Sequence, residues 1–202
     1  IGVLETARRL HENGTALIIL GNHEFRLIQR SVAQKPLDDE RFNRYLPWIR
    51  TLPLFLETAT LRSVHAAWHY SSIQVLKESQ ANDDSFVKRT LDKENAERKA
   101  VQNILSGIKV RLPLNPILRD RFDLPREKGR VKGWKNLEGK SFAECLYSPM
   151  NPNVWDQAPS HQEIAQVEPY LEKDKLVCIG HYSLPPEIEK VMDPIVCVDG
   201  CV

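Results

Sequence analysis

Three of the six histidines in this chain follow short apolar segments of the strand type: His23 after 15–20, His65 after 61–64 and His181 after 176–180. Continuous apolar runs of this length are typical of buried parallel strands. In open α/β folds, ligands bind at the edge where the carboxyl ends of such strands meet. Neutral imidazole is also the commonest metal ligand among side chains. The pattern therefore predicts an α/β fold whose ligand site collects these histidines.

Periodicity along the rest of the chain supports the same fold class. We expect strands at 15–20, 175–179 and 195–198, a strand or hairpin at 56–64, and helices at 1–10, 24–31, 40–49, 72–76, 85–105 and 160–172. Alternation of strands and helices is the signature of an α/β protein. The segment from about 71 to 134 interrupts that alternation, and we interpret it as a cap inserted into a single domain that covers 1–202.

Composition narrows the classes of protein and partner. A length of 202 residues is enough for one domain with a sizeable core, and the formal net charge is +1. So small a charge gives no global attraction to nucleic acid or to an anionic membrane. The apolar runs are too short to span a bilayer, and no signal peptide is visible. We therefore expect neither a membrane nor a nucleic-acid partner.

The cysteines indicate in which cellular compartment we expect the protein. The chain has four cysteines and no C-x-x-C pair, which argues against a structural zinc knuckle: Cys145, Cys178, Cys197 and Cys201. We interpret them as reduced and mostly buried thiols of a cytoplasmic protein. A disulfide framework is the weaker alternative.

A single histidine after a strand is weak evidence, but the residues around the three histidines are more specific. Gly21-Asn22-His23-Glu24 follows an apolar run, 63–67 reads SVHAA, and 179–183 reads IGHYS. In this order, the three segments resemble the ligand motifs of the calcineurin-like metallophosphoesterases, including their phosphoprotein phosphatase branch. The resemblance spans nearly the whole chain and is least certain in the middle.

The resemblance implies a fold and a chemistry. The fold would be a four-layer α/β/β/α sandwich with a helical insertion after His65. The enzyme would use two divalent metal ions of the Mn, Fe or Zn kind to hydrolyse phosphate esters. Its substrate would be a phosphoprotein, or alternatively a nucleotide or dinucleoside polyphosphate.

Residue roles follow from the matched motifs. Asn22, His65 and His181 would hold the second metal ion, because such ions accept mixed nitrogen and oxygen ligands. His23 would be catalytic, stabilising or protonating the leaving-group oxygen. Gly21 would allow a sharp turn beside the site, and Glu24 would orient His23 or its loop.

Two departures from the family pattern shape the interpretation. The motifs D-x-H and G-D-x-x-D-R-G, which carry the ligands of the first metal ion, do not occur here. In the family they precede the segment matched by 21–24, so we expect this chain to be an excerpt that binds metal poorly and turns over little. A degenerate relative that acts as an interaction module is the alternative. Ser183 replaces a second histidine, as in protein-phosphatase-like members and symmetrical dinucleoside tetraphosphatases.

Several further residues have a functional and a structural interpretation. Arg130, in the basic stretch 129–132, is a candidate phosphate ligand, although a solvated basic surface is the commoner role of such stretches. We expect Trp68 and Trp134 to pack in the core or cap. We expect Asp199 to end its strand in a structural role, and His69 to lie at the surface or behind the ligands.

Overall fold

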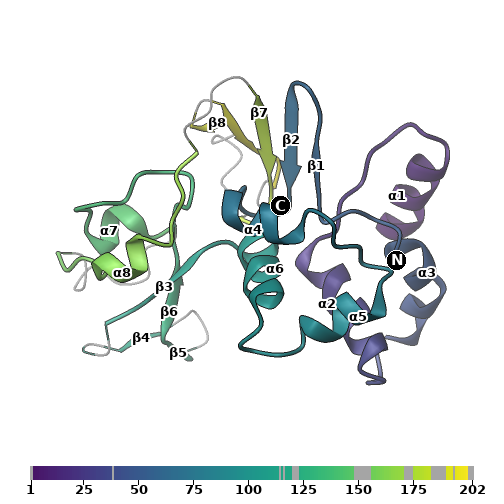
Figure 1. The fold of residues 1–202 in the computed structure, drawn as a ribbon, viewed down its shortest axis with the longest axis horizontal. Coiled ribbons are helices and arrows are strands. Elements are labelled where there is room, and N and C mark those ends of the chain that lie inside the picture. Colours follow the sequence, from purple (N-terminus) through teal and green to yellow (C-terminus); the bar gives the residue numbers. More distant parts are fainter. Residues whose placement is uncertain are drawn as a thin grey trace.

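The computed structural model of the chain describes residues 2–37, 39–113, 115, 117–119, 123–147, 156–170, 175–182, 190–192 and 194–199. They form a mixed α/β fold (Figure 1). In the figure, a five-stranded sheet lies at the top centre, the N-terminal helices lie to its right, and a strand ribbon with two short helices lies to its left.

The sheet has a parallel centre and antiparallel edges. Its order is β1 (Phe55–Glu57), β2 (Leu61–Val64), β7 (Leu176–Ile179), β9 (Ile195–Cys197) and β8 (Lys190–Met192). Strand β7 pairs in parallel with β2 and with β9, whereas β1 and β8 pair antiparallel to their neighbours. The predicted strands at 175–179 and 195–198 and the hairpin at 56–64 are confirmed. The carboxyl ends of β2, β7 and β9 consequently share one edge.

Helices of the first half surround a principal core. They are α1 (Gly2–Glu12), α2 (Asn22–Val32), the 3-10 helix η1 (Glu40–Arg44), α3 (Leu46–Ile49), α4 (Tyr70–Leu76), α5 (Asp84–Arg89) and α6 (Ala96–Ser106). Buried side chains of α2 to α6 join those of β2, β7 and β9 in one apolar cluster. The predicted helix at 85–105 is two helices, because the Asn95 side chain accepts a hydrogen bond from the Glu97 N–H and caps a new one.

Two predicted elements are wrong. Residues 15–20 form no strand: Leu20 donates one backbone hydrogen bond to Pro53, but no described segment continues a ladder, and the Leu17 side chain is 75% exposed. The predicted helix at 160–172 is one turn, α8 (His161–Ile164). Pro169 is unfavourable inside the longer predicted helix, because proline lacks the N–H that a continuing helix needs. Residues 171–172 of that prediction lie outside the described part.

A second apolar cluster lies apart from the principal core. It is built around β3 (Lys109–Arg111), β6 (Lys128–Arg130) and α7 (Phe142–Cys145), and it runs from Ile108 to Val167. Two shorter strands, β4 (Leu118–Arg119) and β5 (Pro125–Arg126), pair beside it. Helices α4 to α6 of the expected insertion at 71–134 pack in the principal core instead. The packing thus divides near Gly107, and a capping role for 71–134 stays a prediction.

Gly107 ends α6 at this division. Its φ of 76° and ψ of 163° belong to a region that is essentially restricted to glycine. A Cβ atom there would lie 2.6 Å from the Tyr182 hydroxyl oxygen and 3.0 Å from Arg130 Cδ. Gly107 therefore lets Tyr182 and Arg130 pack closely against the end of α6.

Substitution of Gly107 tests how much stability depends on the close packing at the end of α6. We expect Gly107→Ala to lower the free energy of unfolding by about 1–3 kcal/mol from backbone strain, with a further loss from the close contacts. The measurement is urea unfolding followed by circular dichroism. Gly139→Ala is the matched control, because Gly139 also has a positive φ but nothing lies within 4 Å of its Cβ position. Equal losses in the two variants would contradict the proposed crowding.

Two further predictions concern thiols and membranes. Cys145, Cys178 and Cys197 are free thiols, as expected, and Cys201 lies outside the described residues. Among the described helices, none has the length and apolar character needed to cross a membrane.

Candidate metal centre

Two of the predicted histidine ligands lie at the carboxyl edge of the sheet. His65 follows β2 and His181 comes two residues after β7, its parallel neighbour. The Gly180 N–H donates to the His65 carbonyl oxygen at 2.9 Å, which ties the two loops together. The centroids of the two imidazole rings are 5.0 Å apart. The sequence pattern correctly placed these histidines side by side.

The third predicted ligand reaches the edge from α2. Asn22 is the first residue of that helix, and its Oδ1 atom lies 2.9 Å from His65 Nε2. Two ligands about 2.1 Å from an octahedral ion stand about 3.0 Å apart when they are adjacent. The Asn22–His65 spacing therefore fits one cation, which would replace the proton between the two atoms.

His181 has an unusual backbone and a charged partner. Its φ is +67°, which is uncommon for a residue with a side chain and is met most often at functional sites. Arg130 Nη2 lies 2.8 Å from His181 Nε2, and Arg130 Nε donates to the Ser106 carbonyl oxygen at 2.8 Å. A neutral imidazole has one lone pair. Arg130 therefore occupies the lone pair of His181 that a metal ion would use.

Electrostatics keep both imidazoles neutral at pH 7. Burial lowers the pKa of His181 to about 3, and the positive charge of Arg130 adds to this effect. Burial also lowers the pKa of His65, against the opposing charges of Glu24 and Asp199. Neutral imidazole is the form that binds metal ions. The two rings are thus in the protonation state that a metal site requires.

Asp199 is a member of this edge whose role the sequence analysis took to be structural. It comes two residues after β9, the other parallel neighbour of β7, and its charge raises the pKa of His65. In the sequence, Asp199 shares the feature that pointed to the histidines: it is a polar residue just after an apolar strand. Asp199 therefore acts on His65 through its charge, and its expected structural role stays a prediction.

His23 and Glu24 occupy the first turn of α2. The side chain of His23 is exposed, and it lies near enough for its charge to lower the pKa values of His65 and His181. No hydrogen bond joins Glu24 to His23 in the described structure. Glu24 instead lies against Gly21, where a Cβ atom would stand 2.6 Å from its Oε2 atom.

Gly21 is required by close approach rather than by a turn. Its φ of −95° and ψ of 173° are extended and open to any residue. A Cβ atom would, however, lie 3.1 Å from His65 Cε1. The absence of a side chain at Gly21 thus allows the start of α2 to approach His65.

The remaining predicted residues have structural partners. Trp68 and Trp134 are buried in the principal core. His69 is also buried and contacts the Ser72 hydroxyl at 2.7 Å, so its expected place at the surface is wrong, and a place behind the ligands stays a prediction. Ser183 lies outside the described residues.

The donor set suits one ion but is incomplete. Within the described ranges, no three His, Cys, Asp or Glu side chains are close enough together to hold a metal ion. The assembled donors are the Asn22 oxygen and two imidazoles, a mixture that ions such as Mn²⁺, Fe²⁺ and Zn²⁺ accept. Further ligands, such as water, substrate oxygens or other carboxylates, would have to complete the coordination.

Comparisons with known proteins give no family for this chain. No protein-family model, no curated protein and no solved structure matches it.

Proposed function

We propose that this chain is part of a metal-dependent, protein-phosphatase-like phosphoesterase. The observation that carries the proposal is the 2.9 Å spacing of Asn22 Oδ1 and His65 Nε2, with His181 and a guanidinium directly beside them. Mixed donors next to an arginine suit hydrolysis of a phosphate ester, because the ester can be bound through its oxygens and its charge. The larger proposal includes two metal ions and the four-layer sandwich of the calcineurin-like enzymes.

Each residue has a definite task in this proposal. Asn22, His65 and His181 hold a divalent ion, which supplies Lewis-acid polarisation of the phosphoryl group when it is bound. Arg130 leaves His181 and donates two parallel hydrogen bonds to phosphate oxygens. His23, exposed at the start of α2, gives a proton to the leaving oxygen.

The test begins with metal binding and proceeds to substrates. We expect Mn²⁺ to raise the melting temperature of the chain, and we expect phosphate release from a phosphopeptide to depend on Mn²⁺. Faster hydrolysis of a dinucleoside tetraphosphate would favour the nucleotide hydrolase instead. An interaction module would show neither effect.

The coding sequence upstream of Ile1 is an independent test. Finding D-x-H and G-D-x-x-D-R-G there supports two metal ions, and their absence contradicts that part of the proposal. The result does not depend on whether the 202-residue chain is itself active.

We further predict that Arg130 and the metal ion compete for the lone pair of His181. Arg130→Met removes a positive charge and frees the His181 lone pair, so we expect Mn²⁺ to bind about fivefold more tightly. Inorganic phosphate should bind about tenfold more weakly, because a charge-assisted contact is lost. Isothermal titration measures both affinities.

Arg111→Met is the control for the metal measurement, since Arg111 lies on the neighbouring strand β3 without a hydrogen bond to His181. Weaker Mn²⁺ binding in Arg130→Met would contradict the competition.

A further inference from the structure

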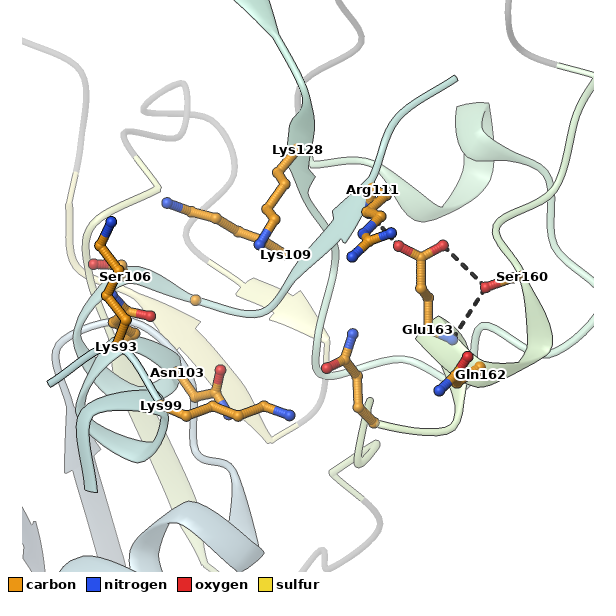
Figure 2. A pocket seen from close by; sticks show the side chains of 13 residues that line it. Lys93, Lys99, Asn103, Ser106, Lys109, Arg111, Lys128, Ser160, Gln162 and Glu163 are labelled. Atoms are coloured by element: carbon orange, nitrogen blue, oxygen red, sulfur yellow. Dashed lines mark hydrogen bonds between the residues drawn. The ribbon is translucent and has the colours of Figure 1, made fainter. Parts of the chain in front are cut away.

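A large polar cleft lies between α6 and the β3–β6 ribbon (Figure 2). Its volume is about 800 Å³, and the lining residues that the structure describes include no apolar side chain: Lys93, Lys99, Gln102, Asn103, Ser106, Gly107, Lys109, Arg111, Lys128, Ser160, Gln162, Glu163 and Gln166. Five of these thirteen residues are cationic and one is anionic. The excess of positive charge in this lining attracts an anion.

The ribbon concentrates its positive charge on one face. Strands β3 and β6 pair antiparallel, with Lys109 opposite Arg130 and Arg111 opposite Lys128. Directly opposed residues share a face of a ribbon. Val110 and its partner Gly129 are buried and belong to the other face. The exposed face thus carries four cations in two opposed pairs.

Such an arrangement is unfavourable for the isolated fold. Like charges directly opposite each other destabilise a strand pair. Among the described residues, no carboxylate forms an ion pair with the lysines of the cleft, which are Lys93, Lys99, Lys109 and Lys128. Loss of solvent contact, together with the charges of Arg130, Arg126 and Lys128, lowers the pKa of Lys109. An anionic ligand would relieve this repulsion.

Glu163, the carboxylate among the described lining residues, is already engaged. It accepts hydrogen bonds from the Ser160 hydroxyl at 3.1 Å and from the Arg111 backbone N–H (Figure 2). These contacts hold α8 against β3. Glu163 therefore shapes one wall of the cleft, and its charge disfavours a continuous polyanion along that wall.

The cleft is connected to the candidate metal centre through Arg130. The Arg130 side chain donates to the carbonyl oxygen of Ser106, a lining residue, and also contacts His181. Lys109 lies near enough for its charge to lower the pKa of His181. Arg130 thus contacts both the candidate metal centre and a residue of the cleft lining.

We propose that the cleft binds acidic residues flanking the phosphorylated residue of a protein substrate, a specificity that rests on the proposed phosphoesterase function. Four amide side chains in the lining, those of Gln102, Asn103, Gln162 and Gln166, can pair with peptide N–H and C=O groups. Single-stranded nucleic acid is commonly bound by stacking of its bases on aromatic side chains, and none of the thirteen described lining residues is aromatic. The negative charge of Glu163 interrupts the positive charge of the lining. Separate carboxylates can avoid Glu163, whereas a continuous polyphosphate chain would be repelled by it.

Binding of a peptide without phosphate tests the cleft by itself. The probe is a fluorescein-labelled peptide of Glu and Gly, measured by fluorescence anisotropy at low and at physiological salt. We expect the double variant Lys109→Glu with Lys128→Glu to raise Kd at least about tenfold, since it replaces two attractions by two repulsions. Lys35→Glu is the matched control, because Lys35 is exposed and lies outside the lining.

Hydrolysis kinetics are the second test of the cleft. Between phosphopeptides with acidic and with neutral flanks, we expect a lower KM for the acidic one, with similar kcat. The double variant should abolish that KM difference. If the longest natural form of the protein that contains this chain has no phosphoesterase activity, the proposed function fails, but the anisotropy measurement still decides whether the cleft binds acidic peptide.

Two results would overturn the inference. The first is unchanged peptide affinity in a double variant that has the circular dichroism spectrum of the unmodified chain. The second is tighter binding of a single-stranded oligonucleotide or of polyphosphate than of the acidic peptide under the same salt.

Discussion

Replacing His65 with alanine is expected to weaken Mn²⁺ binding by at least about two orders of magnitude. Loss of a residue that merely supports a metal ligand already reduces affinity about 10- to 100-fold. His65 is central to the candidate centre, because it contacts Asn22 at 2.9 Å and its ring lies 5.0 Å from that of His181. Equilibrium dialysis and the Mn²⁺-dependent shift in melting temperature measure the loss.

Three further variants test whether the loss of Mn²⁺ binding is specific to the candidate centre. His161→Ala removes an exposed histidine on α8 and should leave Mn²⁺ affinity unchanged. Asn22→Ala and His181→Asn should weaken binding as His65→Ala does; asparagine is chosen at 181 because it tolerates the positive φ there. Equal Mn²⁺ affinity in all four variants and the unmodified chain would show that the ion binds elsewhere.

The sequence was sufficient to predict the meeting of His65 and His181. Apolar runs identified β2 and β7, and the parallel pairing of such strands brings the residues after them together. Asn22 was harder to place, because the run before it forms no strand. It reaches the edge because α2 packs in the principal core through Phe25 and Ile28.

What the sequence could not predict depends on contacts between distant segments. The contact of Arg130 with His181 joins residues 51 positions apart and depends on the close approach at Gly107. The cationic face of the ribbon depends on the register of β3 and β6, which an irregular, proline-rich sequence does not reveal. The division of 85–105 into two helices was also missed, although Asn95 is an ordinary capping residue.

Replacing His23 with alanine is expected to lower kcat about 10²- to 10⁴-fold, the usual effect of removing a general acid. Mn²⁺ affinity should stay nearly unchanged, because His23 is exposed on the first turn of α2 and makes no hydrogen bond with Asn22, His65 or His181 in the described structure. The measurement is phosphopeptide hydrolysis with Mn²⁺, made on the longest natural form of the protein that contains this chain.

Chemical rescue distinguishes proton transfer by His23 from a structural role. Since the side chain is exposed, free imidazole can enter the space left in His23→Ala and should restore part of kcat. A substrate with a good leaving group, such as a nitrophenyl phosphate, needs less help from an acid and should lose much less rate. An equal loss for both substrates without rescue would contradict the assignment, because the altered step would then not be protonation of the leaving oxygen.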